Sequence, residues 1–424
     1  MGLGLSSGGA SIPTVGPSKF SLMQSRMIFG RSNFSLATNT TLHNTYTAEA
    51  DFDWVQLGYF NFTLSSVAID RCAIAPSASL NDNFTPVTGT WTNVTFNNSG
   101  AAGVPPSPSG STTSFTIPAG SGSGNDIIPG IAWSDWMQVS SLARTDSPAV
   151  NLPLLMVRTY SNATQLPTFA PATQTDISTD WPTISLGRTF YSYYKTGDFV
   201  TTPSGFTSPN GPQKYIAPNI VRFISRKRGL TVLGIGDSLT QGINSTSNFN
   251  SWGHQACAAL SSSSLPVMWM NGGWSGQTSG AYYTRARALI RDGSPDVCFI
   301  ATWTPNDSPF TQASADLSWA RAIDLANYCV SLNIVPVLWT PIPQGGTTST
   351  TDAYRLSVVA RVKASGFLYA DFDAVITDGA TPARIKAAAN SIDGVHPGDA
   401  GYGFMAAEAQ RCISAIMSNR PRTG

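Results

Sequence analysis

The hydrophobic positions follow two different patterns along the chain. Between residues 20 and 213, apolar and polar residues alternate in short runs bounded by Pro, Gly, Asn or Ser, for example at 60–64, 89–96 and 154–160. A period of two with frequent turn residues is typical of an antiparallel β-sandwich. We therefore predict a jelly-roll-like accessory domain over 20–213. Within it, 103–126 is low in complexity and predicts a long loop around one short apolar stretch.

Beyond a Pro/Gly-rich joint at 201–213, the pattern changes. Continuous apolar runs now alternate with segments of helical periodicity, and the runs are 231–235, 267–270, 297–301, 334–339 and 367–370. In one intervening segment, Trp319, Ile323 and Ala326 recur along a single helical face. Strands that alternate with helices predict a parallel sheet covered on both faces, so we expect an α/β domain over 225–420.

The amino-acid composition of the chain limits the kinds of molecule that it can bind. Charged residues make up 12% of the 424 residues and the net charge is +1, which argues against a nucleic-acid partner held by phosphate contacts. The basic cluster 226–228 predicts a solvated loop.

No run approaches the roughly 18 apolar residues of a membrane span. Residues 1–19 predict a flexible leader without the pattern of a secretory signal. The surface, rich in Ser, Thr and Asn, favours an extracellular or virion location, and the compartment stays open.

Cysteine usage predicts no metal site. The 5 cysteines show no CxxC spacing and no nearby His partner. Cys298 lies in an apolar run and is expected in the core. Cys257 and Cys412 fall in predicted helices and could form a disulfide, a question that the sequence leaves open.

Candidate chemistry gathers where the predicted parallel strands end, which is the edge at which such sheets bind ligands. The first strand runs into a Gly-Asp-Ser turn, and three later loops bring polar residues to the same edge. These four segments are GDSL at 236–239, NGGWSGQT at 271–278, TPND at 304–307 and DGVHP at 393–397.

A serine hydroxyl needs a base to become a nucleophile, and that base is usually histidine. Of the 3 histidines, His43 lies in the strand-rich half and His254 in a predicted helix, where packing or exposure explains it. His396 alone follows an acid by three positions, in a loop before the last helix. We therefore predict Ser238 as nucleophile, His396 as general base and Asp393 as the acid that orients the imidazole.

An acyl-transfer site also needs donors for the oxyanion. The candidates are the backbone N–H of Ser238, the backbone N–H of Gly276 and the side-chain amide of Asn306. A turn glycine and a helix-capping asparagine are the alternatives for the last two. Neither Gly-x-Ser-x-Gly nor Gly-x-Gly-x-x-Gly occurs at these loops, so an α/β-hydrolase elbow and a dinucleotide site are not predicted.

Taken together, the four segments resemble the blocks of the SGNH hydrolases, the GDSL esterase/lipase family, over the C-terminal half only. The resemblance implies a flavodoxin-like αβα sandwich with a five-stranded parallel sheet, no metal or cofactor, and ester hydrolysis through an acyl-enzyme. One position departs from the family: its third block usually carries Gly two residues before the Asn, and here that residue is Thr304, followed by Pro305. Because proline removes a donor and fixes φ, the Asn306 loop is expected to differ in shape.

The expected function is that of a carbohydrate esterase that removes acetyl groups from an O-acetylated glycan. Acetyl is favoured because no extended apolar lid flanks the blocks. Trp252, Trp274 and Trp303 could wall the acyl pocket or belong to the core, and the aromatic residues of the N-terminal half could stack on sugars or fill the sandwich. The alternatives are a glycan-binding or virion adhesion protein with a vestigial hydrolase domain, and a lipase or thioesterase. The glycan and the oligomeric state stay open.

Overall fold

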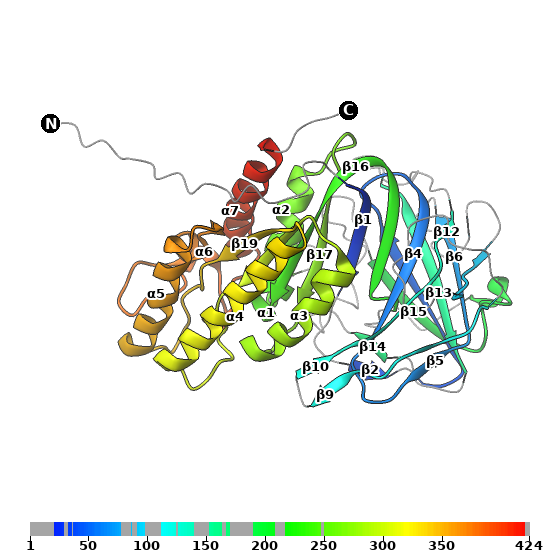
Figure 1. The fold of residues 1–424 in the computed structure, drawn as a ribbon, viewed down its shortest axis with the longest axis horizontal. Helices are drawn as coiled ribbons and strands as arrows, with labels where there is room; N and C mark the ends of the chain where they lie inside the picture. Colours follow the sequence, from blue (N-terminus) through cyan, green and yellow to red (C-terminus); the bar gives the residue numbers. More distant parts are fainter. Residues whose placement is uncertain are drawn as a thin grey trace.

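The computed structural model of the protein describes the chain with gaps. The described residues are 21–28, 33–35, 37–77, 86, 91–97, 112–123, 126–139, 152–162, 167–169, 190–207, 217–246 and 250–419. The leader expected over 1–19 lies outside them, as do parts of the joint 201–213 and of the expected loop 103–126. Figure 1 shows the helices gathered at one end of the molecule and most strands of the N-terminal half at the other.

The C-terminal half alternates strands and helices. Its strands are β16 (Ile220–Gly236), β17 (Val267–Gly273), β18 (Val297–Ala301), β19 (Val335–Trp339) and β20 (Leu368–Ala370). Its helices are α1 (Ser238–Gln241), α2 (Trp252–Leu260), α3 (Ser279–Gly293), α4 (Gln312–Ser331), α5 (Ser349–Ala364), α6 (Phe372–Ile376), α7 (Asp399–Ser418) and the short 3-10 helix η4 (Ala387–Ala389). Each predicted apolar run forms a strand here, so the expected α/β fold is confirmed.

The parallel strands run in the order β17-β16-β18-β19-β20. After β16, the chain places β17 on one side of that strand and then β18, β19 and β20 on the other side. With right-handed crossovers, this reversal places helices on opposite faces of the sheet. Accordingly α3, α4 and α5 pack as one group of neighbours, and α2, α6 and α7 pack as another. Ligands bind at such a reversal, beyond the carboxyl end of the first strand.

The N-terminal half is rich in strands, as expected. They are β1 (Ser21–Ile28), β2 (Asn33–Ser35), β3 (Thr40–Thr47), β4 (Phe52–Asn61), β5 (Val67–Ile69), β6 (Arg71–Ser77), β7 (Thr92–Asn93), β8 (Phe115–Ile117), β9 (Ser121–Ser123), β10 (Asp126–Ile128), β11 (Gly130–Trp133), β12 (Met137–Gln138), β13 (Leu154–Ser161), β14 (Pro167–Phe169) and β15 (Phe190–Thr196), with the 3-10 helix η2 (Pro203–Gly205). Five of them form an antiparallel sheet in the order β15-β3-β13-β6-β7.

Two local predictions in this half need correction. The short apolar stretch expected within the loop 103–126 forms a strand, β8, because Phe115 and Ile117 alternate with exposed Thr116 and point into the core, and the part expected to be loop also contains β9, which pairs antiparallel with β10. Of the run 60–64, only residues 60 and 61 lie in a strand, the longer β4, which ends where the Asn61 side chain accepts hydrogen bonds from the backbone N–H and hydroxyl of Thr63.

A single long strand, β16, belongs to both halves. Residues 220–225 pair antiparallel with β4, and residues 230–236 pair parallel with β17. The expected start of the second domain at 225 therefore lies inside a strand. Because β1 and β4 join it, the sheet is larger than the five strands expected and is mixed, with 9 strands. Figure 1 shows β16 running between the two ends of the molecule.

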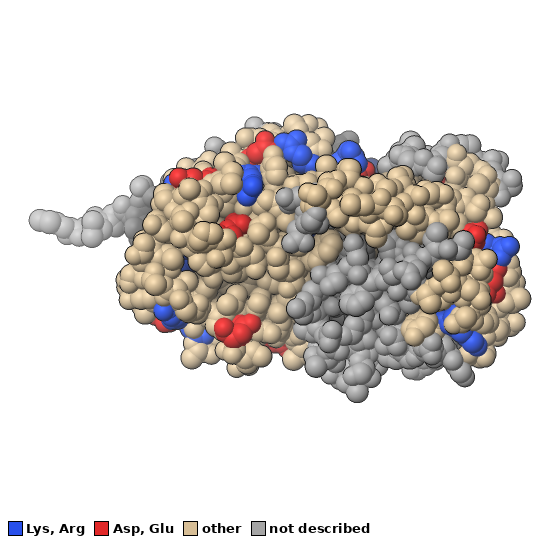
Figure 2. All heavy atoms as spheres, turned by 90° about the horizontal axis from the view of Figure 1, so that it is seen from below, with Lys and Arg blue, Asp and Glu red and all other residues tan. Residues whose placement is uncertain are grey.

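The basic cluster 226–228 lies in this strand, not in a loop. Its three side chains are exposed, and Arg226 forms an ion pair with Asp53, 2.7 Å between Nη2 and Oδ1. On the face drawn in Figure 2, Lys and Arg side chains are scattered, many of them beside acidic residues. The described residues on that face therefore form no continuous basic field.

The core continues from one half into the other. Its buried side chains form one cluster that includes Tyr59 of β4 and Trp269 of β17. The Tyr59 hydroxyl lies 2.9 Å from Thr159 Oγ1 of β13, so β4 faces the five-stranded antiparallel sheet. No helix in the described residues is long and apolar enough to cross a bilayer.

All five cysteines are buried and none forms a disulfide. The bridge considered between Cys257 and Cys412 is therefore absent. Instead, the Cys412 thiol donates to the carbonyl oxygen of Tyr369, at 3.2 Å. Burial raises the pKa of the Cys412 thiol to about 12.

Candidate active site

The turn after β16 presents Ser238 as the first residue of α1. Asp237 caps this helix, because its Oδ1 accepts the backbone N–H of Leu239 at 2.9 Å. A Cβ on Gly236 would lie 2.3 Å from Thr240 Oγ1, so the passage from strand to helix is too tight for a side chain there. The backbone N–H of Ser238 belongs to the first turn of a helix, where N–H groups lack intrahelical partners.

The structure brings the three predicted catalytic side chains together. His396 Nε2 lies 2.8 Å from Ser238 Oγ, and His396 Nδ1 lies 2.6 Å from Asp393 Oδ2. The second carboxylate oxygen of Asp393 accepts the backbone N–H groups of Val395 and His396, at 2.9 and 2.8 Å. A carboxylate on Nδ1 fixes the tautomer in which Nε2 can accept the serine proton.

The Asp393 carboxyl is held in its ionised form. Partial burial would raise its pKa, but the hydrogen bonds from the His396 ring and from the backbone of His396 and Val395 outweigh that effect and lower the pKa to about 2. The side chain of Asp393 is 41% exposed and that of His396 is 17% exposed. The acid and base therefore stand at the rim of the site, within reach of a bulky substrate.

Gly276 lies in the loop that follows β17. Its φ is +77°, and a Cβ there would meet nothing within 4 Å, so its backbone faces open space. Gln241 of α1 ties this loop to the nucleophile helix: its backbone oxygen accepts the Asn271 amide at 3.1 Å, and its side-chain oxygen accepts the Ser275 N–H at 2.7 Å. The loop thus has a fixed position beside Ser238.

The Asn306 side chain is tied to the same loop. Its amide nitrogen donates to the carbonyl oxygen of Gln277 at 3.1 Å and to Thr304 Oγ1 at 3.0 Å. The Thr304 hydroxyl accepts one of the two N–H groups of the amide, and the Gln277 carbonyl oxygen accepts the other; the difference in loop shape expected from Pro305 stays a prediction. The role of Asn306 in an oxyanion hole stays a prediction.

Thr304 also reaches the nucleophile turn, a role that the sequence did not reveal. Its hydroxyl donates a hydrogen bond to Asp237 Oδ2. Burial raises the pKa of the Asp237 carboxyl, and the hydrogen bonds from Thr304 and from the Leu239 backbone counteract part of that rise. The sequence signal for this role was Thr304 itself, a residue with a side chain at a position where the family usually has glycine.

The three tryptophans beside the blocks have different places. Trp303 is buried and lines a small pocket. Trp252 is fully buried against the ring of Trp269 and donates its indole N–H to the backbone oxygen of Leu239, at 3.1 Å, so it supports the nucleophile helix from the core. Trp274 is half-buried and meets the ring edge of Phe62 from the N-terminal half, with ring centroids 5.2 Å apart.

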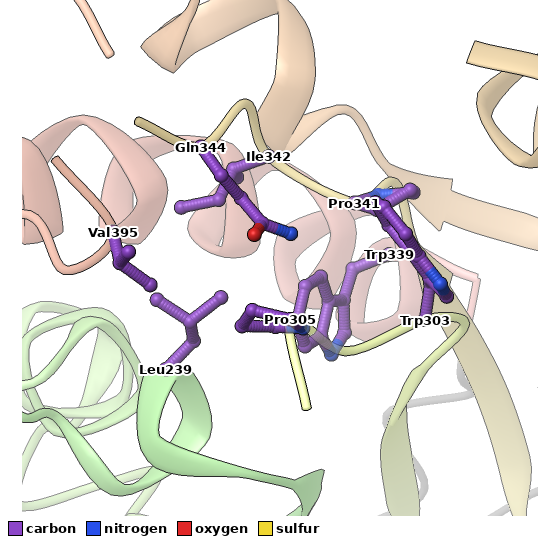
Figure 3. A pocket seen from close by; sticks show the side chains of 8 residues that line it. All are labelled: Leu239, Trp303, Pro305, Trp339, Pro341, Ile342, Gln344 and Val395. Atoms are coloured by element: carbon purple, nitrogen blue, oxygen red, sulfur yellow. The ribbon is translucent and has the colours of Figure 1, made fainter. Parts of the chain in front are cut away.

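The pocket lies between residues that neighbour the predicted catalytic groups (Figure 3). Leu239 follows the nucleophile, Val395 precedes the base and Pro305 precedes Asn306. The lining is completed from the ends of β18 and β19 by Trp303, Trp339, Pro341, Ile342 and Gln344. Its volume is about 10 Å³, close to what one water-sized group needs. Sequence reasoning missed Ile342 and Gln344, although their place after a parallel strand was a usable signal.

The other two histidines take no part in this arrangement. His43 is buried in β3, where its Nδ1 accepts a hydrogen bond from Arg158 at 3.3 Å. His254 is buried in α2, 3.0 Å from the Ser251 hydroxyl. Within the described ranges, no group of three or more His, Cys, Asp or Glu side chains could hold a metal ion.

Comparison with known proteins identifies the C-terminal half. Residues 235–404 match the model of the GDSL-like Lipase/Acylhydrolase family, so the resemblance drawn from the four blocks is confirmed. No curated protein matches the chain significantly.

Several solved structures resemble less than half of the chain. A lipolytic protein of the G-D-S-L family from Desulfitobacterium hafniense is 23% identical, with a TM-score of 0.37, and covers 43% of this chain and 99% of its own. A mutant of an acetyl-xylooligosaccharide esterase from Geobacillus Stearmophilus is 24% identical, with a TM-score of 0.36, over 43% of this chain and 94% of its own. A family 3 carbohydrate esterase from Clostridium thermocellum is 15% identical, with a TM-score of 0.35, over 46% of this chain and 100% of its own.

Proposed function

We propose that this chain, whose residues 235–404 are those of a GDSL-type hydrolase, removes acetyl groups from an O-acetylated carbohydrate through an acyl-enzyme on Ser238. The observation that carries the proposal is the unbroken path of hydrogen bonds from Asp393 through His396 to the Ser238 hydroxyl. In this arrangement the imidazole can take the serine proton while the carboxylate holds the ring in position.

The reaction follows from this geometry. Ser238 Oγ attacks the ester carbonyl carbon while His396 Nε2 takes the hydroxyl proton, and the carbonyl oxygen becomes an oxyanion. Collapse of the tetrahedral intermediate expels the alcohol, which receives the proton from His396 and leaves acetyl-Ser238. A water molecule then attacks the acetyl carbon, with His396 again as base, and acetate departs as Ser238 recovers its proton.

Oxyanion stabilisation is assigned to three donors. The backbone N–H of Ser238 lies at the start of α1, and Gly276 offers an N–H in a stretch that a side chain does not cover. Asn306 joins them by turning one N–H donor from Thr304 toward the oxyanion. The two backbone N–H groups are fixed before the reaction and act at no cost of reorganisation when the charge develops, whereas Asn306 must first release the Thr304 hydroxyl.

Two features favour a short acyl group on a large substrate. The pocket lined by Leu239 and Val395, the neighbours of Ser238 and His396 in the chain, has a volume of only about 10 Å³, which suits acetyl and disfavours the long chains of a lipase or thioesterase. The partly exposed His396 and Asp393 suit an ester presented by a polymer that does not enter the protein. The low-charge surface leads us to propose an extracellular or virion-associated site of action.

The rival proposal is a glycan-binding or adhesion protein with a vestigial hydrolase domain. Intact hydrogen bonds within the triad argue against it, because a domain freed from catalysis has no need to keep them. A fluorophosphonate probe distinguishes the two: it labels Ser238 of an esterase and leaves a vestigial site unmodified.

The direct test is hydrolysis of p-nitrophenyl acetate by the full chain and by Ser238→Ala. We expect kcat to fall by about 10⁴-fold or more in the variant with its unfolding temperature retained. Acetate release from a panel of acetylated polysaccharides then identifies the carbohydrate. Equal rates for the two proteins would refute the catalytic assignment.

A further inference from the structure

The segment after β19 forms the wall of the pocket opposite the catalytic loops. It runs past Pro341 and Ile342 to Gln344, and its end is anchored to the loop that carries the catalytic base: Gly345 N–H donates to the Gly394 carbonyl oxygen, at 2.6 Å. A Cβ on Gly345 would lie 3.2 Å from the Gly394 Cα, so the two loops are in close contact. These contacts hold the segment after β19 in a fixed position relative to the loop that carries His396.

Gln344 is the one lining residue whose side chain ends in a carboxamide. The residue is 6% exposed, and Figure 3 shows the carboxamide pointing into the space between Leu239, Pro305 and the indole rings. The backbone of Gln344 holds the loop: its carbonyl oxygen accepts from the Thr347 hydroxyl at 3.0 Å and from Arg384 Nη1 at 3.4 Å. Truncating the side chain leaves both of these bonds in place.

Four of the other lining residues are fixed by the core. Leu239, Ile342, Trp303 and Trp339 are at most 2% exposed and belong to the main hydrophobic cluster. Close-packed core side chains do not move aside for a larger ligand without loss of packing. Gln344 is outside that cluster, so a change in its length can alter the depth of the pocket without rebuilding the core.

We propose that this pocket is the acyl subsite and that the Gln344 side chain closes it, so that it admits the methyl of an acetyl group and excludes longer acyl chains. This inference rests on the proposed esterase function and adds the residue that sets its acyl specificity. The carboxamide acts by its size: it fills the place that the third and fourth carbons of a butyryl chain would occupy.

The test compares p-nitrophenyl acetate, propionate and butyrate as substrates of the wild type, Gln344→Ala and Gln344→Met. Alanine removes the carboxamide and shortens the side chain, whereas methionine keeps its length without the amide. We expect Gln344→Ala to raise the ratio of kcat/KM for butyrate to that for acetate by about tenfold or more, the range that one methylene commands in a hydrophobic pocket. Gln344→Met should keep the ratio near that of the wild type.

Each other outcome has a definite meaning. An unchanged ratio in Gln344→Ala, with acetate still hydrolysed, refutes this inference and leaves the esterase function standing. A ratio that rises equally in Gln344→Met shows that the amide and not its size is responsible, which also refutes it. A wild type that hydrolyses none of the three esters, at a rate equal to Ser238→Ala, refutes the proposed function itself.

Discussion

The hydroxyl of Thr304 donates a hydrogen bond to the buried carboxylate of Asp237, one residue before the nucleophile. The same Oγ1 accepts the Asn306 amide at 3.0 Å and the Asn306 backbone N–H at 3.3 Å. One side chain therefore connects the turn that presents Ser238 with the loop that carries a candidate oxyanion donor.

Replacing Thr304 should reveal this connection. Thr304→Val keeps the shape but leaves Asp237 Oδ2 buried without its donor, so we expect a loss of about 1–3 kcal/mol in the free energy of unfolding. We also expect a lower kcat for acetate esters, since the Asn306 loop loses its anchor. Thr304→Ser retains the hydroxyl and serves as control. Urea unfolding and steady-state kinetics measure both effects, and equal behaviour of valine and serine would contradict the prediction.

Asp393→Asn tests the orientation of the imidazole. Asparagine can present an N–H to Nδ1 and so favour the wrong tautomer of His396, and we expect kcat to fall by about 10²–10⁴-fold with KM nearly unchanged. Initial rates with p-nitrophenyl acetate measure the loss. A fall confined to KM would show that Asp393 serves binding instead.

The acid side of the pH profile should be simple. Because the pKa of Asp393 is lowered to about 2, its carboxylate stays ionised wherever the enzyme is assayed and adds no proton-binding step to the acid side of the profile. A plot of log kcat/KM should then fall with a slope of about one above roughly pH 4. A slope near two would show that the carboxyl titrates there as well.

The lowered pKa of Asp393 also makes the stability of the folded protein depend on pH. A carboxyl with a lowered pKa in the folded state stabilises the protein above its unfolded-state value, about 3.9, and this contribution is lost as the pH falls through about 2. Unfolding temperatures of the wild type and Asp393→Asn should therefore converge toward pH 2.

The contact between Phe62 and Trp274 should make the N-terminal half matter to catalysis. Phe62→Ala removes a buried ring and should cost about 3–5 kcal/mol of stability. We also expect kcat/KM to fall about tenfold, because Trp274 adjoins the Gly276 loop and small displacements there are costly.

A matched control separates the two effects. Phe96→Ala removes a buried ring of the same half that stacks on Phe115, with centroids 3.6 Å apart and no ring contact with Trp274 among those described. It should lose comparable stability while the folded protein keeps its kcat/KM. If both variants lost activity alike, the effect would be one of stability only.

The triad could be predicted because its signals are local. A Gly-Asp-Ser turn after an apolar run and an acid three residues before His396 are each visible within a few positions, and parallel strand ends bring them to one edge. The extent of β16 could not be predicted in this way. The exposed side chains at 226–228 interrupt its apolar run and imitate a loop, and its pairing with β4 joins residues about 165 positions apart, which no periodicity reveals.

The pocket was harder to foresee for a related reason. Trp252 and Trp303 look alike in the sequence, yet one fills the core behind α1 and the other lines the pocket. Whether an aromatic ring near the end of a strand points into the core or toward the pocket depends on the residues that pack around it in the tertiary structure. Gln344 carried no chemical signature at all, since its importance comes from the depth of a space formed by distant residues.

Strand β16 also determines the order in which the chain can fold during its synthesis. One edge of β4 is completed only by residues 220–225, so a nascent chain that has emerged as far as residue 213 still exposes that edge to other chains. The strand that covers it continues directly into the turn bearing Ser238. The first half can therefore close its sheet only after residues 220–225 have been made. Because these residues form one strand with residues 230–236 of the second half, both halves should reach the native state as one cooperative unit.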